Sequence, residues 1–314
     1  MNRNNENSKS EIARILVGAA GNNKLELVKD ILHDNPNLIN VKHPETGRTP
    51  LVEALLGNHI DVIKELLKNK GVDVNMMVDT DVKKDFRATP LFAAIYKCKT
   101  KLVKLLLDDS RLDVNKSDSD GRSAITSAID NECKDIIDDL LKQDNIKLET
   151  EDKHGWFPLL LASWLGQLDT VKKLCNAGVN VNKQNKDGHT SLIFACSIAR
   201  VDIVEYLLDN GANKELKNNS GENALDITID LLANTNNNRE KKEDLYKIIL
   251  LLKPNKNNNN NNKTRKPNKN NNNNKKTRNS NKKNNNNNNN TNYRKTFKYN
   301  KPKRVEFEPT PVYN

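Results

Sequence analysis

Apolar residues recur along residues 10–253 with the spacing of one face of a helix. In one such segment, Val62 and Ile63 are followed one helical turn later by Leu66 and Leu67, which predicts a helix that buries a single stripe. Further segments with this spacing are Leu102, Val103 and Leu106; Ile136, Ile137, Leu140 and Leu141; Val171, Leu174 and Cys175; and Ile203, Val204, Leu207 and Leu208. A glycine turn and a shorter stretch of small residues precede each of them. The pattern therefore predicts units of a turn and two helices.

These units repeat at a steady period. The segments that align are GRTPLVEALL at Gly47, GRSAITSAID at Gly121, GWFPLLLASW at Gly155, GHTSLIFACS at Gly188 and GENALDITID at Gly221, with a diverged copy, RATPLFAAIY, that has Arg87 in the glycine position. The spacing from Gly47 to Arg87 is 40 residues, and each later copy begins 33 or 34 residues after the one before it. One helix pair cannot bury its apolar stripe alone, whereas stacked copies can, so the period predicts a repeat protein.

The aligned copies resemble the ankyrin repeat. They share its glycine, Thr-Pro-Leu, small-residue pair, second turn, aliphatic helix and closing Gly-Ala-x-Val-Asn, most closely in residues 155–182 and 188–215. The resemblance implies an all-α solenoid of helix-turn-helix units with short β-hairpin tips. It also implies a non-catalytic scaffold or adaptor that binds a protein partner on the concave face, which is formed by the tips and the first helices.

The resemblance divides the chain into three parts. Residues 1–9 are predicted to be a disordered N-terminus, and residues 10–253 an ankyrin domain. Its seven repeats are expected near 10–42, 43–75, 85–115, 118–150, 152–182, 185–216 and 218–253. The extra residues before the third repeat fall in NMMVDTDVKKDF, which predicts one longer tip. The first copy, from Ala13, and the seventh, from Gly221, are expected to be terminal caps, and the seventh to have a long connection, ANTNNNREKKED, before its second helix, LYKIILLLK.

The remaining residues, 254–314, differ sharply in composition. From Pro254 to Asn292, 23 of 39 residues are Asn, a composition that predicts disorder because almost nothing can be buried. The chain has a formal charge of +11, but residues 254–314 hold 16 Lys and Arg against two Glu, so residues 1–253 carry 36 basic and 39 acidic residues. The positive charge therefore belongs to the tail. Its end interleaves aromatic and basic residues suited to single-stranded nucleic acid: Tyr293, Arg294, Lys295, Phe297, Lys298, Tyr299, Lys303 and Arg304.

Site chemistry is sparse. The chain has no GxxxxGK[ST], HExxH or GxSxG motif and no GxGxxG after a strand, so neither an enzyme nor a cofactor is predicted. The five histidines are scattered, and His59 falls where ankyrin repeats commonly have a histidine after the central turn. Cys98, Cys133, Cys175 and Cys196 have no CxxC spacing and lie in apolar segments. They are interpreted as small buried hydrophobes, with a disulfide or metal site as the less favoured alternative.

A partner site is predicted around the two tryptophans. In the ankyrin register, Trp156 follows the tip glycine and Trp164 ends the first helix of the same repeat, positions that vary with the partner in the family. Exposed aromatics there would be binding anchors; alternatively, both would pack against the next repeat. The neighbouring positions that complete the predicted site are Tyr96, Lys97, Asp130, Asn131, His154, Asp187, His189 and Ile198.

The sequence is compatible with two functions. The leading one is a protein-interaction module, and the alternative is a nuclear or nucleic-acid-associated protein that uses its basic tail. No apolar run is long enough to span a bilayer and the N-terminus lacks the apolar stretch of a secretory signal, so the expected location is cytoplasmic or nuclear, without membrane insertion.

Overall fold

A computed structural model describes residues 2–79, 86–235 and 238–253 and has a pair of helices in each predicted repeat. The first helices are α1 (Asn2–Gly21), α3 (Pro50–Gly57), α5 (Pro90–Tyr96), α7 (Ala124–Asp130), α9 (Pro158–Trp164), α11 (Ser191–Ser197) and α13 (Ala224–Asn234). The second helices are α2 (Leu25–Asp34), α4 (Ile60–Lys68), α6 (Thr100–Leu107), α8 (Lys134–Leu141), α10 (Leu168–Asn176), α12 (Val201–Asp209) and α14 (Arg239–Leu252), and a 3-10 turn, η1 (Pro36–Leu38), follows α2. The predicted all-α repeat fold is confirmed.

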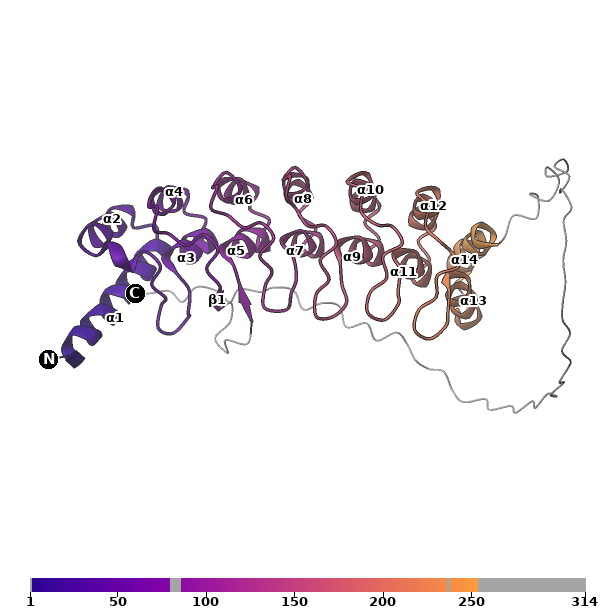
Figure 1. Ribbon diagram of the computed structural model, residues 1–314, viewed down its shortest axis with the longest axis horizontal. Helices are drawn as coiled ribbons and strands as arrows, with labels where there is room; N and C mark the ends of the chain where they lie inside the picture. The colour runs from indigo at the N-terminus through magenta and orange to yellow at the C-terminus, as the bar shows by residue number, and fades with distance from the viewer. Residues whose placement is uncertain (1, 80–85, 236–237, 254–314) are drawn as a thin grey trace, which may run out of the picture. The chain divides into compact units, whose positions relative to one another are not determined.

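The first helices lie side by side in one row, and the second helices form another row along it (Figure 1). The turns that precede the first helices, here called tips, extend from the first row on the side away from the second helices (Figure 1). The apolar stripes predicted from the sequence are buried; Val62, Ile63 and Leu66 of α4, for example, have no exposed surface. A first helix is enclosed by its two neighbours and its own second helix, so Pro90–Ile95 of α5 are all buried.

Capping side chains and left-handed backbone turns determine where the first helices begin and end. Thr49, Ser123 and Thr190 each accept a hydrogen bond from the backbone N–H three residues on, which caps the first helix. After each of the first six first helices, α1 to α11, one residue takes a left-handed conformation that reverses the chain into the second helix. These residues are Asn23, Asn58, Cys98, Glu132, Gly166 and Ala199, with φ between 48° and 71°.

The longer tip that was predicted before the third repeat contains a β-hairpin. β1 (Val78–Asp79) pairs antiparallel with β2 (Arg87–Ala88), with Val78 opposite Ala88. In the other described tips, two backbone hydrogen bonds close the turn, as from Asp118 N–H to the Arg122 carbonyl at 3.1 Å and from Gly121 N–H to the Asp118 carbonyl at 3.0 Å. Short β-hairpins were predicted at all the tips, but among the described residues only the tip of the third repeat contains paired strands.

The two end repeats differ from their predicted boundaries. Helix α1 begins at Asn2, within the residues predicted to be a disordered N-terminus. Helix α14 begins at Arg239, so the long connection predicted before residue 245 is mostly helix. Asn238 caps this start by accepting a hydrogen bond from Lys241 N–H at 2.9 Å, and the Arg239–Glu243 pair supports the first turn at 3.0 Å.

Candidate partner-binding face

The tips are closed by one polar side chain that occupies the same place in successive repeats. Asp118 and Asp152, and then Asn185 and Asn218, accept two backbone hydrogen bonds each, from the residues two and four positions on, at 2.8–3.1 Å. The residue four positions on follows the tip glycine, and its N–H is therefore held inside the turn. Local side-chain hydrogen bonds of this kind define the shape of a turn.

Backbone hydrogen bonds also join one tip to the next. Ser119 N–H donates to the Arg87 carbonyl at 2.8 Å, and Lys153 N–H donates to the Asp120 carbonyl at 2.8 Å. At Gly188, φ is 77° and an added Cβ would lie 2.9 Å from the Asn218 Cα in the next tip, so only glycine fits there without a backbone shift. The spacing of the tips is thus fixed by the fold.

The ends of the first helices lie beside the tips. The Trp164 ring, at the end of α9, is 6.2 Å from the ring of Trp156, which follows the tip glycine. One repeat earlier, Asp130 at the end of α7 lies 3.8 Å from Arg122 in the equivalent tip position. The tips and these helix ends, here called the tip face, therefore form a continuous surface along the repeats.

Most of the predicted partner-binding residues are accessible on the tip face. His154 and Asp187 are exposed at their tips, and His154 lies 3.9 Å from Asp120 of the preceding tip. The helix-end residues that keep solvent-exposed surface are Tyr96, Lys97, Asn131, Trp164 and Ile198.

Three predicted residues are instead buried, which corrects the prediction that they are exposed. Trp156 is 2% exposed because its ring packs 5.3 Å from Phe194 of the next first helix, α11, as well as against Trp164. His189 is 7% exposed, with its ring 5.4 Å from Phe194, and burial lowers the pKa of this histidine. Asp130 has no exposed surface. The packing agrees with the alternative that the tryptophans stack on the next repeat, and Trp164 alone of the two retains some exposure.

Buried ion pairs occupy the equivalent position, beside the tips, in the second and fourth repeats, and the sequence pattern had not predicted a role for their arginines. Arg48 lies 3.6 Å from Glu53, and Arg122 lies 3.6 Å from Asp118, all with side chains at most 3% exposed. Desolvation by burial raises the pKa of Asp118 to about 6, although the charge of Arg122 opposes the shift. Arg48 and Arg122 directly follow the tip glycine, as Trp156 does, so the repeat alignment contained the signal for this buried position.

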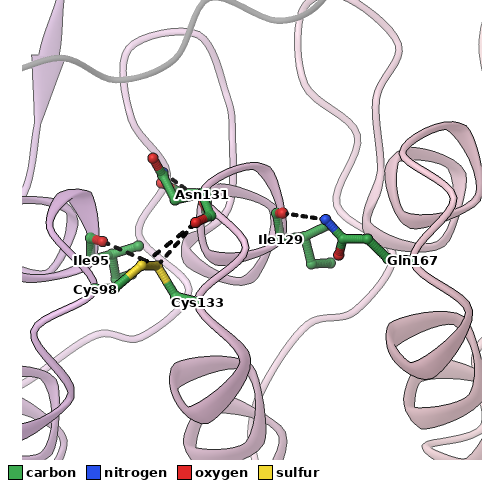
Figure 2. The surroundings of a disulfide bond; sticks show 7 residues. Ile95, Cys98, Ile129, Asn131, Cys133 and Gln167 are labelled. Carbon is green, nitrogen blue, oxygen red and sulfur yellow. Dashed lines mark hydrogen bonds between the residues drawn. A yellow bond between two sulfur atoms is a disulfide. The ribbon is translucent and has the colours of Figure 1, made fainter.

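The cysteine prediction is wrong for two of the four residues. Cys98 and Cys133 form a disulfide across a sequence separation of 35, from the end of α5 to the start of α8 (Figure 2). Cys98 is exposed, whereas Cys133 is 4% exposed. Cys175 and Cys196 are free thiols; Cys196 is buried, as expected, whereas Cys175 is only half-buried, and burial raises the pKa of Cys196 to about 12.

Two broader properties of the described residues bear on function. None of their helices has the length and apolar character that crossing a membrane requires. Within residues 2–79, 86–235 and 238–253, no group of three or more His, Cys, Asp or Glu side chains is placed to hold a metal ion. The aromatic and basic residues proposed for nucleic-acid binding, 293–304, lie outside the described part of the chain.

Stacked helix pairs joined by tethered tips define a helical-repeat solenoid protein. The sequence pattern of ankyrin repeats (3 copies) matches residues 16–118, 74–152, 110–185 and 159–231. The chain belongs to the ankyrin-repeat family. Ankyrin repeats are generally protein–protein interaction modules.

Solved structures show the same fold. The ankyrin repeat domain of Bcl-3, described as a unique member of the IkappaB protein family, matches with a TM-score of 0.61 and 21% identity over 74% of this chain and 97% of that one. The human ASB11 ankyrin repeat domain matches with a TM-score of 0.56 and 27% identity over 76% and 97%. The first of these likenesses concerns the fold alone.

Two longer proteins are similar in sequence to part of the chain. The transient receptor potential cation channel subfamily A member 1 of Homo sapiens is 26% identical over 161 residues, which are 51% of this chain and 14% of the channel. Alpha-latrocrustotoxin-Lt1a of Latrodectus tredecimguttatus is 30% identical over 148 residues, or 45% of this chain and 10% of the toxin. The chain thus spans only a small part of either relative.

Proposed function

We propose that this chain is a non-catalytic scaffold or adaptor that binds a protein partner on the tip face. The observation that carries the proposal is the tip face itself: tethered tips and first-helix ends place chemically different, accessible side chains at regular intervals. A surface that is ordered before binding loses little conformational entropy when a partner binds.

Trp164 is the strongest candidate for an anchor. Its ring packs edge-on against Phe194 at 5.7 Å and against Trp156, so the indole is held in place before a partner arrives, while part of it remains exposed. Tyr96 has the equivalent helix-end position two repeats earlier, with exposed Lys97 beside it. Trp and Tyr are enriched among the few residues that dominate the binding energy of protein interfaces.

The proposal is tested by photo-crosslinking from matched positions. A photoreactive residue replaces Lys97 in the full chain, and in a second variant it replaces Lys101, an exposed residue of the second helix in the same repeat. His154 and Lys172 form a second pair in the fifth repeat. Because only the tip face is proposed to bind, positions 97 and 154 should crosslink one and the same protein, and positions 101 and 172 should not.

Two outcomes count against the proposal. Equal crosslinking from Lys101 and Lys172 would place the contact on the second helices. No defined product from Lys97 or His154, in extracts where the chain is known to be bound, would leave the tip face without a partner.

A further inference from the structure

We propose that Cys98 and Cys133 form a reversible thiol–disulfide site that links the third and fourth repeats in response to the glutathione redox balance. The proposal rests on the junction between these repeats and does not depend on the proposed partner binding. Cys98 follows α5, Cys133 directly precedes α8, and their Cα atoms are 5.2 Å apart, within the range that a disulfide spans.

Equivalent positions in other repeats explain what Cys133 does when it is reduced. His59 and Gln167 occupy the same place before α4 and α10, and their side-chain nitrogens lie 2.8 and 2.9 Å from the carbonyl oxygens of Gly21 and Ile129, each 38 residues earlier. Cys133 Sγ lies 3.5 Å from the Ile95 carbonyl, again 38 residues earlier. A thiol at Cys133 would therefore donate the hydrogen bond that other residues make at this junction.

Cys98 also has an acceptor for its thiol, because its Sγ lies 3.5 Å from the Asn131 carbonyl (Figure 2). In the reduced state each thiol would therefore have a carbonyl acceptor, and in the oxidised state the two sulfurs are bonded to each other. Reduction would leave no buried polar group unsatisfied, so the folded junction accommodates dithiol as well as disulfide.

The backbone at Cys98 does not depend on the bond. Cys98 has φ of 48°, and Asn58 and Ala199, which occupy the same position in repeats with no disulfide, have φ of 60° and 59°. The left-handed turn is a property of the repeat. Opening the disulfide therefore requires no rearrangement of the turn.

Exposure assigns different roles to the two thiols. Exposed Cys98 is the sulfur that a small disulfide can reach, and Cys133, at 4% exposure, is reached only by Cys98. The Cys98 thiolate attacks glutathione disulfide, forming a mixed disulfide and releasing one glutathione thiolate. The Cys133 thiolate then attacks Cys98 Sγ and releases the second glutathione. Two electrons pass to glutathione disulfide, and the protons of the two protein thiols pass to the two glutathiones.

The other two cysteines do not compete for this chemistry. Burial raises the pKa of both Cys175 and Cys196, so both stay as thiols that react slowly. Neither is bonded to a second cysteine. The exchange is therefore confined to one junction.

The test titrates the full chain in buffers of varied glutathione to glutathione disulfide ratio. Free thiols are alkylated, and the peptide linking Cys98 and Cys133 is quantified by mass spectrometry. A single two-electron transition in this peptide is expected within the range of the buffers. Cys175 and Cys196 should remain reduced throughout. Helical circular dichroism should not change across the transition.

Cys133→Gln provides the matched control, because it copies Gln167 and should restore the hydrogen bond to the Ile95 carbonyl without a thiol. In this variant the transition should vanish and amide exchange in α7 and α8 should be the same in both buffers, whereas wild-type exchange should slow on oxidation. Three results would overturn the proposal: no linked peptide at any ratio, a link that is reduced only after unfolding, or loss of helix on reduction.

Discussion

At the scale of single residues, the buried side chains that follow the tip glycines make two kinds of contact. We call these side chains and their partners at the first helices the buried layer. In the N-terminal repeats the layer contains ion pairs, as at Arg48 and Glu53, while Trp156 and Phe194 form an aromatic cluster farther along. A buried pair gains little net stability because desolvation opposes the attraction of the charges. The aromatic cluster removes apolar surface from water without that opposing cost.

Asp118 makes the stability of this layer depend on pH. Its pKa is about 6 in the folded protein because the carboxyl is buried, against 3.8 for the free side chain, so the folded state binds the proton more tightly. The free energy of unfolding should therefore fall as pH rises from about 4 to about 6, by on the order of 3 kcal/mol. Asp118→Asn should remove this component, since Asn185 and Asn218 already close their tips with an amide.

Urea unfolding of both forms at several pH values measures the effect. The variant should show a flatter profile between about pH 4 and 6, while the contributions of other groups remain. An unchanged slope in Asp118→Asn would mean that another group causes the dependence.

Trp156→Ala should destabilise the chain by ~3–5 kcal/mol, because it leaves a cavity between α9 and α11. The ring is 2% exposed and contacts two other aromatic rings. Trp164→Ala should cost less, since part of that ring already meets solvent. Denaturation midpoints compare the two variants. A wild-type midpoint for Trp156→Ala would revive the prediction that this tryptophan is an exposed anchor.

At the scale of elements, the sequence predicts what is set by local spacing and misses what depends on contacts between repeats. The helix pairs follow from apolar periodicity, and the long tip follows from the irregular spacing before Arg87. Helix α14 starts early because its first turns are exposed charged residues, which have helix propensity but no apolar pattern. Cys98 and Cys133 occupy neighbouring positions of consecutive repeats, 35 residues apart in sequence, and only the stacking of the repeats brings them together.

The same contrast holds for the candidate site. The ankyrin register located Tyr96, Lys97 and Trp164 at helix ends, where the structure has them accessible. The register could not decide the burial of Trp156 or His189, because burial depends on Phe194 of the following first helix. The alignment of a single repeat therefore cannot predict burial at these positions, because burial depends on the size of the side chain in the next repeat.

Helix α13, the first helix of the seventh repeat, begins with a capping box. The Asn223 side chain accepts a hydrogen bond from Asp226 N–H at 2.9 Å, and Asp226 accepts one from Asn223 N–H at 3.1 Å. Asn223→Ala should cost ~1 kcal/mol, and Asn223→Ser should recover most of it because serine is also a good N-cap. Native-state hydrogen exchange in α13 reports this loss as ~5-fold faster exchange. Equal exchange in the Ala and Ser variants would assign no role to the cap.

At the scale of the whole molecule, repeats two to six present the tip face as one surface. Side chains such as Asp152 hold the shape of each tip, and backbone hydrogen bonds join neighbouring tips. The surface is therefore built from similar units, each of which depends mainly on its neighbours. Under the proposed function, the residues that differ among the units would determine which partner fits. The basic excess of the chain lies in residues 254–314, so a partner attracted by charge alone would be bound by that segment and not by the tip face.

The most direct measurement of the central claim is a hydrogen-exchange map of the full chain with and without the protein captured by crosslinking. Protection is expected in peptides from the tips at residues 118–121, 152–155 and 185–188 and from the ends of α5 and α9. Exchange in the exposed faces of α6, α8 and α10 should be unchanged. Protection confined to those second helices, or to peptides from residues 254–314, would contradict binding on the tip face.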